Sequence, residues 1–169
     1  MKNIVWKMDQ VITFAHNAHE GQKRKYTGED YINHPIAVAS MVRETSPYEY
    51  EMQFAAILHD VLEDTKVTHE EMRTFLFKIL SIEEAKTVFK LVVELTDVFT
   101  KEAFPEFNRK KRKELEAERL SFASLDARFI KTMDMKDNLK SIMEHDPKFA
   151  KVFLAEKDYL MKKMNFLEK

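Results

Sequence analysis

Apolar residues recur at intervals of three or four positions along most of this chain, a spacing that is typical of amphipathic helices. Residues that form turns are scarce, because the chain has only two glycines and four prolines. Such a composition favours helices joined by short loops over sheets. The clearest apolar stripes are Met8, Val11, Ile12, Ala15 and Ala18 in one segment, and Ile82, Ala85, Val88, Phe89, Val92 and Leu95 in another. We therefore predict an all-α fold.

Local signals predict where further helices begin and end. Thr68 with Glu71, and Ser81 with Glu84, have the spacing of capping boxes. Prolines in first-turn positions predict helix starts at Pro35 and, after a Ser46 cap, at Pro47. The other predicted segments are loops over 21–33 and 97–108, an exposed helix over 109–120, a helix over 124–143, and a last helix over about 147–166 with Phe149, Val152, Phe153 and Leu160 on its inner face.

The composition favours one compact domain over residues 1–169 and excludes several classes of protein. Hydrophobic residues make up 44% of the chain and charged residues 34%, which is too apolar for a disordered protein. The formal net charge of -1 gives no overall attraction to nucleic acid or to an anionic membrane. No apolar run reaches the ~18 residues of a membrane span. With no cysteine and no signal-like segment after Met1, we expect a cytoplasmic protein without nucleic-acid or membrane partners, and its oligomeric state stays open.

A histidine and an aspartate stand inside the apolar run 54–62, as His59 and Asp60. A buried carboxylate is costly unless something compensates its charge, and a metal ion does so strongly. Two similar candidates are His34, next to a predicted helix start, and Asp134, which interrupts an apolar stripe. Together these four residues predict a site for one divalent metal ion with two imidazole and two carboxylate ligands.

Helical spacing would place further polar groups beside these ligands. Glu63 follows His59 by four residues, and Asp64 follows Asp60 by four, so each pair shares a face if the helix continues through Asp64. Asn138 follows Asp134 by the same interval. The alternative interpretation is a surface His-Asp pair followed by a solvated helix end. The surrounding apolar run and the additional ligands favour the metal site.

The loop before His34 carries three cations, among them Arg24 and Lys25. Arg24 is suited to stack on a base or to fork onto phosphate oxygens, and Lys25 offers a point charge; the alternative is a mobile solvated loop. The remaining histidines have simpler interpretations: His16 and His19 as surface or loop-packing residues, His69 as exposed, and His145 within a turn. The basic run 108–113 is suited to contact polyphosphate or, as charge runs more often do, to form a solvated face.

The chain resembles the HD-domain hydrolases of the RelA/SpoT type in four segments, which are 18–29, 31–35, 58–65 and 130–139. The resemblance runs from about residue 8 to 143, and the short length is similar to the stand-alone small alarmone hydrolases. It implies hydrolysis of the 3′-pyrophosphate of guanosine tetra- and pentaphosphate, a reaction of the stringent response. It also implies one manganese ion on His34, His59, Asp60 and Asp134, a hydrolytic role for Glu63 and Asp64, and nucleotide contacts from Arg24, Lys25 and Asn138.

Two alternatives to this function stay open. The first is an HD-type phosphohydrolase that acts on another small nucleotide, such as a nucleoside monophosphate or a dinucleotide phosphate. The second is a nucleotide-sensing module that binds without turnover. Such a module would be expected to lack a metal ligand or the acidic pair, and this chain retains both.

Overall fold

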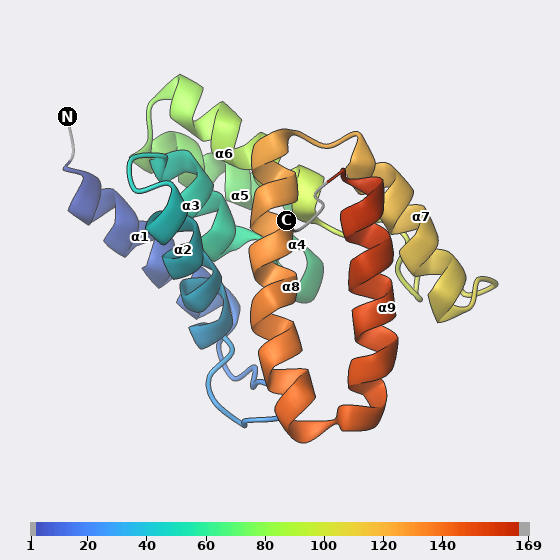
Figure 1. The fold of residues 1–169 in the computed structure, drawn as a ribbon. Helices are drawn as coiled ribbons and strands as arrows, with labels where there is room; N and C mark the ends of the chain where they lie inside the picture. Colours follow the sequence, from blue (N-terminus) through green and yellow to red (C-terminus); the bar gives the residue numbers. More distant parts are fainter. Residues whose placement is uncertain (1–2, 166–169) are drawn as a thin grey trace. The chain divides into compact units, whose positions relative to one another are not determined.

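The computed structural model describes residues 3–165, and this part of the protein consists of helices joined by loops (Figure 1). The helices in this range are α1 (Ile4–Ala18), α2 (Asn33–Thr45), α3 (Tyr50–Leu58), α4 (Val61–Asp64), α5 (His69–Ile79), α6 (Ile82–Leu95), α7 (Arg109–Ser121), α8 (Leu125–His145) and α9 (Pro147–Lys163). The only extended pairing within it is an isolated antiparallel bridge between Lys23 and Asp30. The all-α prediction is confirmed. None of the helices found between residues 3 and 165 combines the length and apolar character that a membrane crossing requires.

The chain divides into two compact units, Met1–Thr96 and Asp97–Lys169. In the first unit, α3 packs against α1, α2 and α6. Every residue from Met52 to Leu58 is buried, including the polar Gln53, so this part of α3 has no face toward solvent. A helix that is buried on all sides needs such a shell of neighbours. This burial brings the His-Asp pair at the end of α3 into the interior.

The capping boxes of the first unit are confirmed. Thr68 accepts from the backbone of Glu71, and the Glu71 carboxylate accepts from the Thr68 backbone. Ser81 and Glu84 make the same reciprocal pair at the start of α6. The first-turn position of Pro35 in α2 is also confirmed. The prediction for Pro47 is wrong, because α3 begins only at Tyr50 and the residues before it form a turn.

In the second unit, α7 and α8 pack against α9, and Figure 1 shows α8 and α9 as long neighbours joined by a short turn. Their shared core contains Ala117, Leu120, Met135, Leu160, Met161 and Met164. The segment 109–120 is therefore not exposed on all sides, since its inner face is buried in this core. On α9 the face differs from the prediction, because Val152 is exposed. The predicted end of this helix at residue 166 lies outside the described residues.

Candidate active site

Three of the four predicted metal ligands come together in the first unit. His34 lies in the first turn of α2, His59 ends α3, and Asp60 precedes α4. The Oδ2 atom of Asp60 lies 3.0 Å from His59 Nε2 and 3.6 Å from His34 Nε2. One ligand atom from each of the three residues lies within 4.8 Å of the others, and both imidazoles are buried. The spacing is that of groups that can share one cation.

The His59 ring is fixed by a hydrogen bond to the last turn of α3. Its Nδ1 atom lies 2.8 Å from the carbonyl oxygen of Ala56 and donates to it. The neutral ring then carries its lone pair on Nε2, which faces the carboxylate oxygen of Asp60. Two acceptors that face each other need a proton or a metal ion between them, and this set of two imidazoles and a carboxylate fits a divalent metal ion.

The predicted helix is interrupted at the His-Asp pair. The Ala56 carbonyl, which accepts from the Asp60 N–H in an ideal helix, accepts here from the His59 ring. Residues 59 and 60 form a turn, and α4 begins at Val61. The condition for the shared faces, one helix that runs unbroken through Asp64, is therefore not met.

Tyr31 is a component of the site that the sequence did not single out. Its hydroxyl donates to Asp60 Oδ2 over 2.7 Å, and its side chain is also among the groups that act on the pKa of Asp64. The break between α3 and α4 does not separate Asp60 from Asp64, because the Asp64 N–H donates to the Asp60 carbonyl over 2.8 Å. No periodicity marks a tyrosine in a loop, so this role was visible only once the fold brought the loop to α4.

The two predicted catalytic acids both lie on α4 and both are exposed. Desolvation by the surrounding chain raises the pKa of Asp64, and the charge of Asp60 raises it further. Hydrogen bonds from Tyr31 and Gln22 act in the opposite direction but do not reverse the shift. A carboxyl whose pKa lies above its ordinary value is better suited to accept a proton near neutral pH.

The predicted nucleotide-binding loop is held closed by its backbone. The Arg24 N–H donates to the Glu29 carbonyl over 2.9 Å, and the Gly28 N–H returns to the Arg24 carbonyl over 3.0 Å. Gly28 has a φ of 71°, which L side chains rarely adopt. Lys25 is exposed, with its ammonium 4.7 Å from the centre of the Tyr26 ring. The loop therefore presents its cations from a defined backbone.

Asp134 and Asn138 lie on α8, in the second unit. They share a face, as the four-residue spacing predicts, and the Asn138 amide donates to Asp134 Oδ1 over 2.7 Å. Lys131 lies 2.9 Å from the other carboxylate oxygen of Asp134. Within its own unit, Asp134 is thus held by an amide on one oxygen and an ammonium on the other. Its place among the metal ligands stays a prediction.

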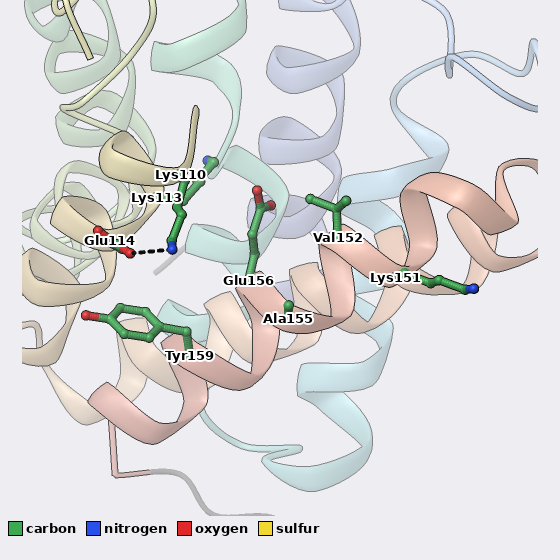
Figure 2. A pocket seen from close by; sticks show the side chains of 8 residues that line it. All are labelled: Lys110, Lys113, Glu114, Lys151, Val152, Ala155, Glu156 and Tyr159. Carbon is green, nitrogen blue, oxygen red and sulfur yellow. Dashed lines mark ion pairs between the residues drawn. The ribbon is translucent and has the colours of Figure 1, made fainter. Parts of the chain in front are cut away.

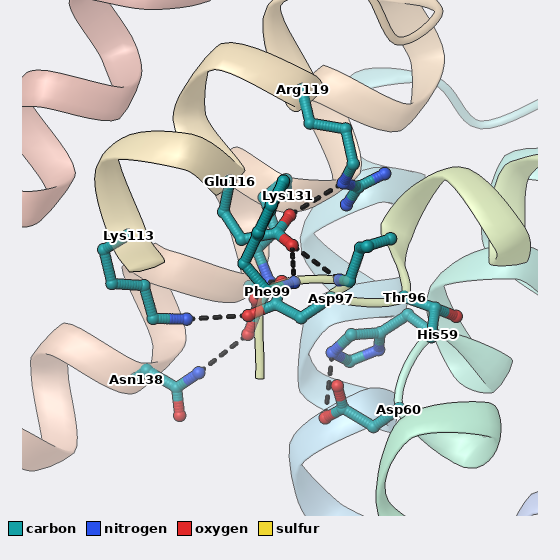
Figure 3. A network of polar contacts seen from close by, with 12 residues as sticks. His59, Asp60, Thr96, Asp97, Phe99, Lys113, Glu116, Arg119, Lys131 and Asn138 are labelled. Carbon is teal, nitrogen blue, oxygen red and sulfur yellow. Dashed lines mark hydrogen bonds and ion pairs between the residues drawn. The ribbon is translucent and has the colours of Figure 1, made fainter. Parts of the chain in front are cut away.

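A buried acidic cluster at the start of the second unit was not predicted. Asp97 lies 2.7 Å from Lys113 and 3.9 Å from Lys131 (Figure 3). Burial opposes ionisation of Asp97, but these two ammonium groups outweigh it and lower its pKa. Glu116 accepts from the backbone N–H groups of Val98 and Phe99. In the sequence these acids stand in segments that were interpreted as a loop and an exposed helix, which concealed their burial.

The basic run 108–113 borders a pocket of about 470 Å³ between α7 and α9 (Figure 2). Lys110 and Lys113 line it from α7, but each has an acidic neighbour, since Lys110 lies 4.0 Å from Glu114 and Lys113 pairs with Asp97. Arg109 forms a two-bonded ion pair with Glu156 of α9. This local neutralisation favours a solvated helix face over a polyphosphate site.

The other four histidines, His16, His19, His69 and His145, lie at surface or loop-packing positions or at a helix end. His19 is buried at the end of α1, where its Nδ1 atom lies 2.8 Å from Gln22 Oε1, which fits the loop-packing interpretation. His16 and His69 are exposed. His145 is the last residue of α8, so its assignment to a turn is wrong by one position.

A family model for the HD domain matches residues 12–157, and the chain therefore belongs to the HD-domain family. The guanosine-3′,5′-bis(diphosphate) 3′-pyrophosphohydrolase MESH1 of Homo sapiens is 33% identical over 136 residues, which cover 79% of this chain and 68% of that protein. Its counterpart in Danio rerio is 30% identical over 82% of this chain and 70% of the relative.

Other relatives share a shorter segment or the fold. The bifunctional (p)ppGpp synthase/hydrolase SpoT of Escherichia coli K12 is 47% identical over 66 residues, which are 39% of this chain and only 9% of SpoT. A solved structure, described as a metazoan ortholog of SpoT that hydrolyses ppGpp, matches 94% of this chain and 85% of its own with a TM-score of 0.77 and 24% identity. Family membership and the cluster of His34, His59 and Asp60 together support a divalent metal ion.

Proposed function

We propose that this protein is a manganese-dependent phosphohydrolase that removes the 3′-pyrophosphate of guanosine polyphosphates. With guanosine 3′,5′-bis(diphosphate), one water is consumed and the products are GDP and pyrophosphate. The observation that carries the proposal is the cluster of His34, His59 and Asp60, whose ligand atoms lie within 4.8 Å. The relatives named for this reaction, which match most of the chain, supply the substrate. The same resemblance implies a cytoplasmic protein of the stringent response.

The residues have distinct parts in this proposal. His34, His59, Asp60 and Asp134 are the proposed metal ligands. A divalent ion bound there would lower the pKa of a water and polarise a phosphoryl oxygen. Glu63 and Asp64 are proposed to orient the attacking water and accept its proton, and the raised pKa of Asp64 supports this assignment.

Recognition of the nucleotide is assigned to three residues. Arg24 is proposed to stack on the purine and Lys25 to contact phosphate. The closed backbone of their loop supports this, because an ordered loop loses little conformational freedom when the ligand binds. Asn138 is proposed to contact the ribose. Lys131 is proposed to offset substrate charge.

The direct test is turnover by the purified full chain loaded with manganese, followed by anion-exchange chromatography of the nucleotides. We expect guanosine 3′,5′-bis(diphosphate) to disappear with stoichiometric release of GDP and pyrophosphate. An intact guanosine substrate together with cleavage of a nucleoside monophosphate would favour the general phosphohydrolase. Binding without any cleavage would favour the sensing module.

The assignment of Arg24 has its own test with a matched control. Arg24→Ala should raise KM with little change in kcat, because stacking holds the ground state and the transition state alike. Arg43 is an exposed arginine near the end of α2, in the same unit. Arg43→Ala should keep KM within about twofold of the parent, as surface substitutions usually have small effects. Equal KM values for the parent and Arg24→Ala would remove Arg24 from the binding site.

A further inference from the structure

We propose that Tyr31 is a positioning residue, whose hydroxyl fixes the Asp60 carboxylate toward the two imidazoles. The catalytic part of this inference rests on the proposed function. The part that concerns Asp60 and metal affinity does not depend on the substrate. Tyr31, Asp60 and Asp64 all lie in the first unit.

The hydrogen bond from Tyr31 acts on the carboxylate oxygen that faces both histidines. The hydroxyl lies 2.7 Å from Asp60 Oδ2, and the same oxygen lies 3.0 Å from His59 Nε2 and 3.6 Å from His34 Nε2. A carboxylate oxygen has two lone pairs, so it can accept from the hydroxyl and still bind a cation. Without the hydroxyl, the carboxylate is freer to rotate about its terminal bond.

The position of the hydroxyl is itself determined by the loop and by α2. The Tyr31 N–H donates to the Gln22 carbonyl over 3.1 Å, and the Tyr31 carbonyl accepts from the His34 N–H over 2.9 Å. The Tyr31 ring lies with its centre 4.8 Å from that of His19 and 5.8 Å, edge-on, from that of His34. Tyr31 is thus braced against one proposed ligand, His34, while it holds another, Asp60.

The backbone joins Asp60 to the proposed acid, because the Asp64 N–H donates to the Asp60 carbonyl over 2.8 Å. A shift of Asp60 after loss of the Tyr31 hydroxyl would therefore also displace Asp64. Loss of the hydroxyl should affect metal affinity and the chemical step together, whereas a residue that only contacts substrate would affect KM.

The test compares Tyr31→Phe, which removes one oxygen and keeps the ring, with Tyr48→Phe as a control. Tyr48 is 82% exposed in the turn before α3, so its hydroxyl touches neither acid. Groups that orient metal ligands typically change affinity or activity by about 10–100-fold when they are removed. We expect calorimetry to give a manganese Kd that is raised by at least about 10-fold in Tyr31→Phe. At saturating metal, the substitution should change kcat, which it lowers, more than it changes KM.

The outcomes distinguish this inference from the proposed function. A weaker manganese Kd in Tyr31→Phe supports the role on Asp60 even if the parent leaves guanosine 3′,5′-bis(diphosphate) intact. A Kd within twofold of the parent overturns it, whether or not the parent turns over. A rise in KM alone also overturns it, because Tyr31 would then be a substrate contact.

A second measurement needs no variant and keeps the inference testable if Tyr31→Phe does not fold. The chain has five tyrosines, and all of them can be labelled as 3-fluorotyrosine. Because the Tyr31 hydroxyl bonds a proposed ligand, at least one fluorine resonance should shift when the parent is saturated with diamagnetic zinc. A fluorine spectrum that is unchanged by zinc overturns the proposal.

Discussion

Glu116 should contribute more to stability than any exposed acid on the same helix. Its side chain is 4% exposed, and Oε1 accepts from the backbone N–H groups of Val98 and Phe99 over 2.5 and 2.6 Å. Its other oxygen pairs with Arg119 over 2.8 Å. Hydrogen bonds to a charged group contribute about 1.5–3 kcal/mol each. Exposed Val98 can exchange its bond for water, so we expect Glu116→Ala to lower the free energy of unfolding by about 3 kcal/mol, in the range for a broken buried pair.

Urea denaturation followed by circular dichroism measures this loss, and Glu118→Ala is the matched control. Glu118 lies on the same helix, is 56% exposed, and pairs with Lys163 over 2.8 Å. Exposed pairs of this kind contribute about 0–1 kcal/mol. At about 2–4 °C per kcal/mol for a chain of this size, Glu116→Ala should lower Tm by about 6–12 °C. Equal losses in the two variants would refute the reasoning, because buried acceptors would then count no more than exposed ones.

Three further predictions concern the metal, the chemistry and pH. Asp60→Ala and Asp134→Ala should each lose most bound metal by elemental analysis, and unchanged metal in both would remove the site. Glu63→Gln should retain metal and lose turnover by about 10²-fold or more, as when a positioned acid–base group is removed. Activity within a few-fold of the parent would mean that Glu63 has no catalytic role and is only a residue at the end of a helix. The hydrogen bond from Lys7 lowers the pKa of Glu84 to about 2, below the ordinary 4.5, so the pair stabilises the fold above pH 4.5 and this contribution is lost as pH falls toward 2. The difference in unfolding free energy between the parent and Glu84→Gln should shrink over that range, and a constant difference would contradict it.

Features that depend on neighbouring residues were predictable from the sequence. The capping boxes at Thr68 and Ser81 are confirmed because each is a contact between residues three apart. The shared helix face of Asp134 and Asn138 is confirmed for the same reason, since one helical turn separates them. The burial of His59 followed from the apolar run around it.

Features that depend on an interruption of a helix or on long-range packing were not predictable. The helix ends at Leu58 and a turn follows at residues 59 and 60, an interruption that the apolar periodicity of the segment does not mark. The exposure of Val152 depends on which side of α9 meets α7 and α8. Tyr31 and Glu116 act on residues 29 and 18 positions away, so their partners were set by the fold alone.

The two capping boxes have a consequence for the order of folding. They start α5 and α6, which follow one another closely and pack together, so this helix pair forms from contacts that are close in sequence. Contacts of short sequence separation form fastest, since little loop entropy is lost. The proposed ligands His34 and His59 come together when α2 and α3, which are also consecutive in the chain, dock. We therefore expect α5 and α6 to belong to the folding nucleus of the first unit, and metal uptake to follow its assembly rather than to drive it.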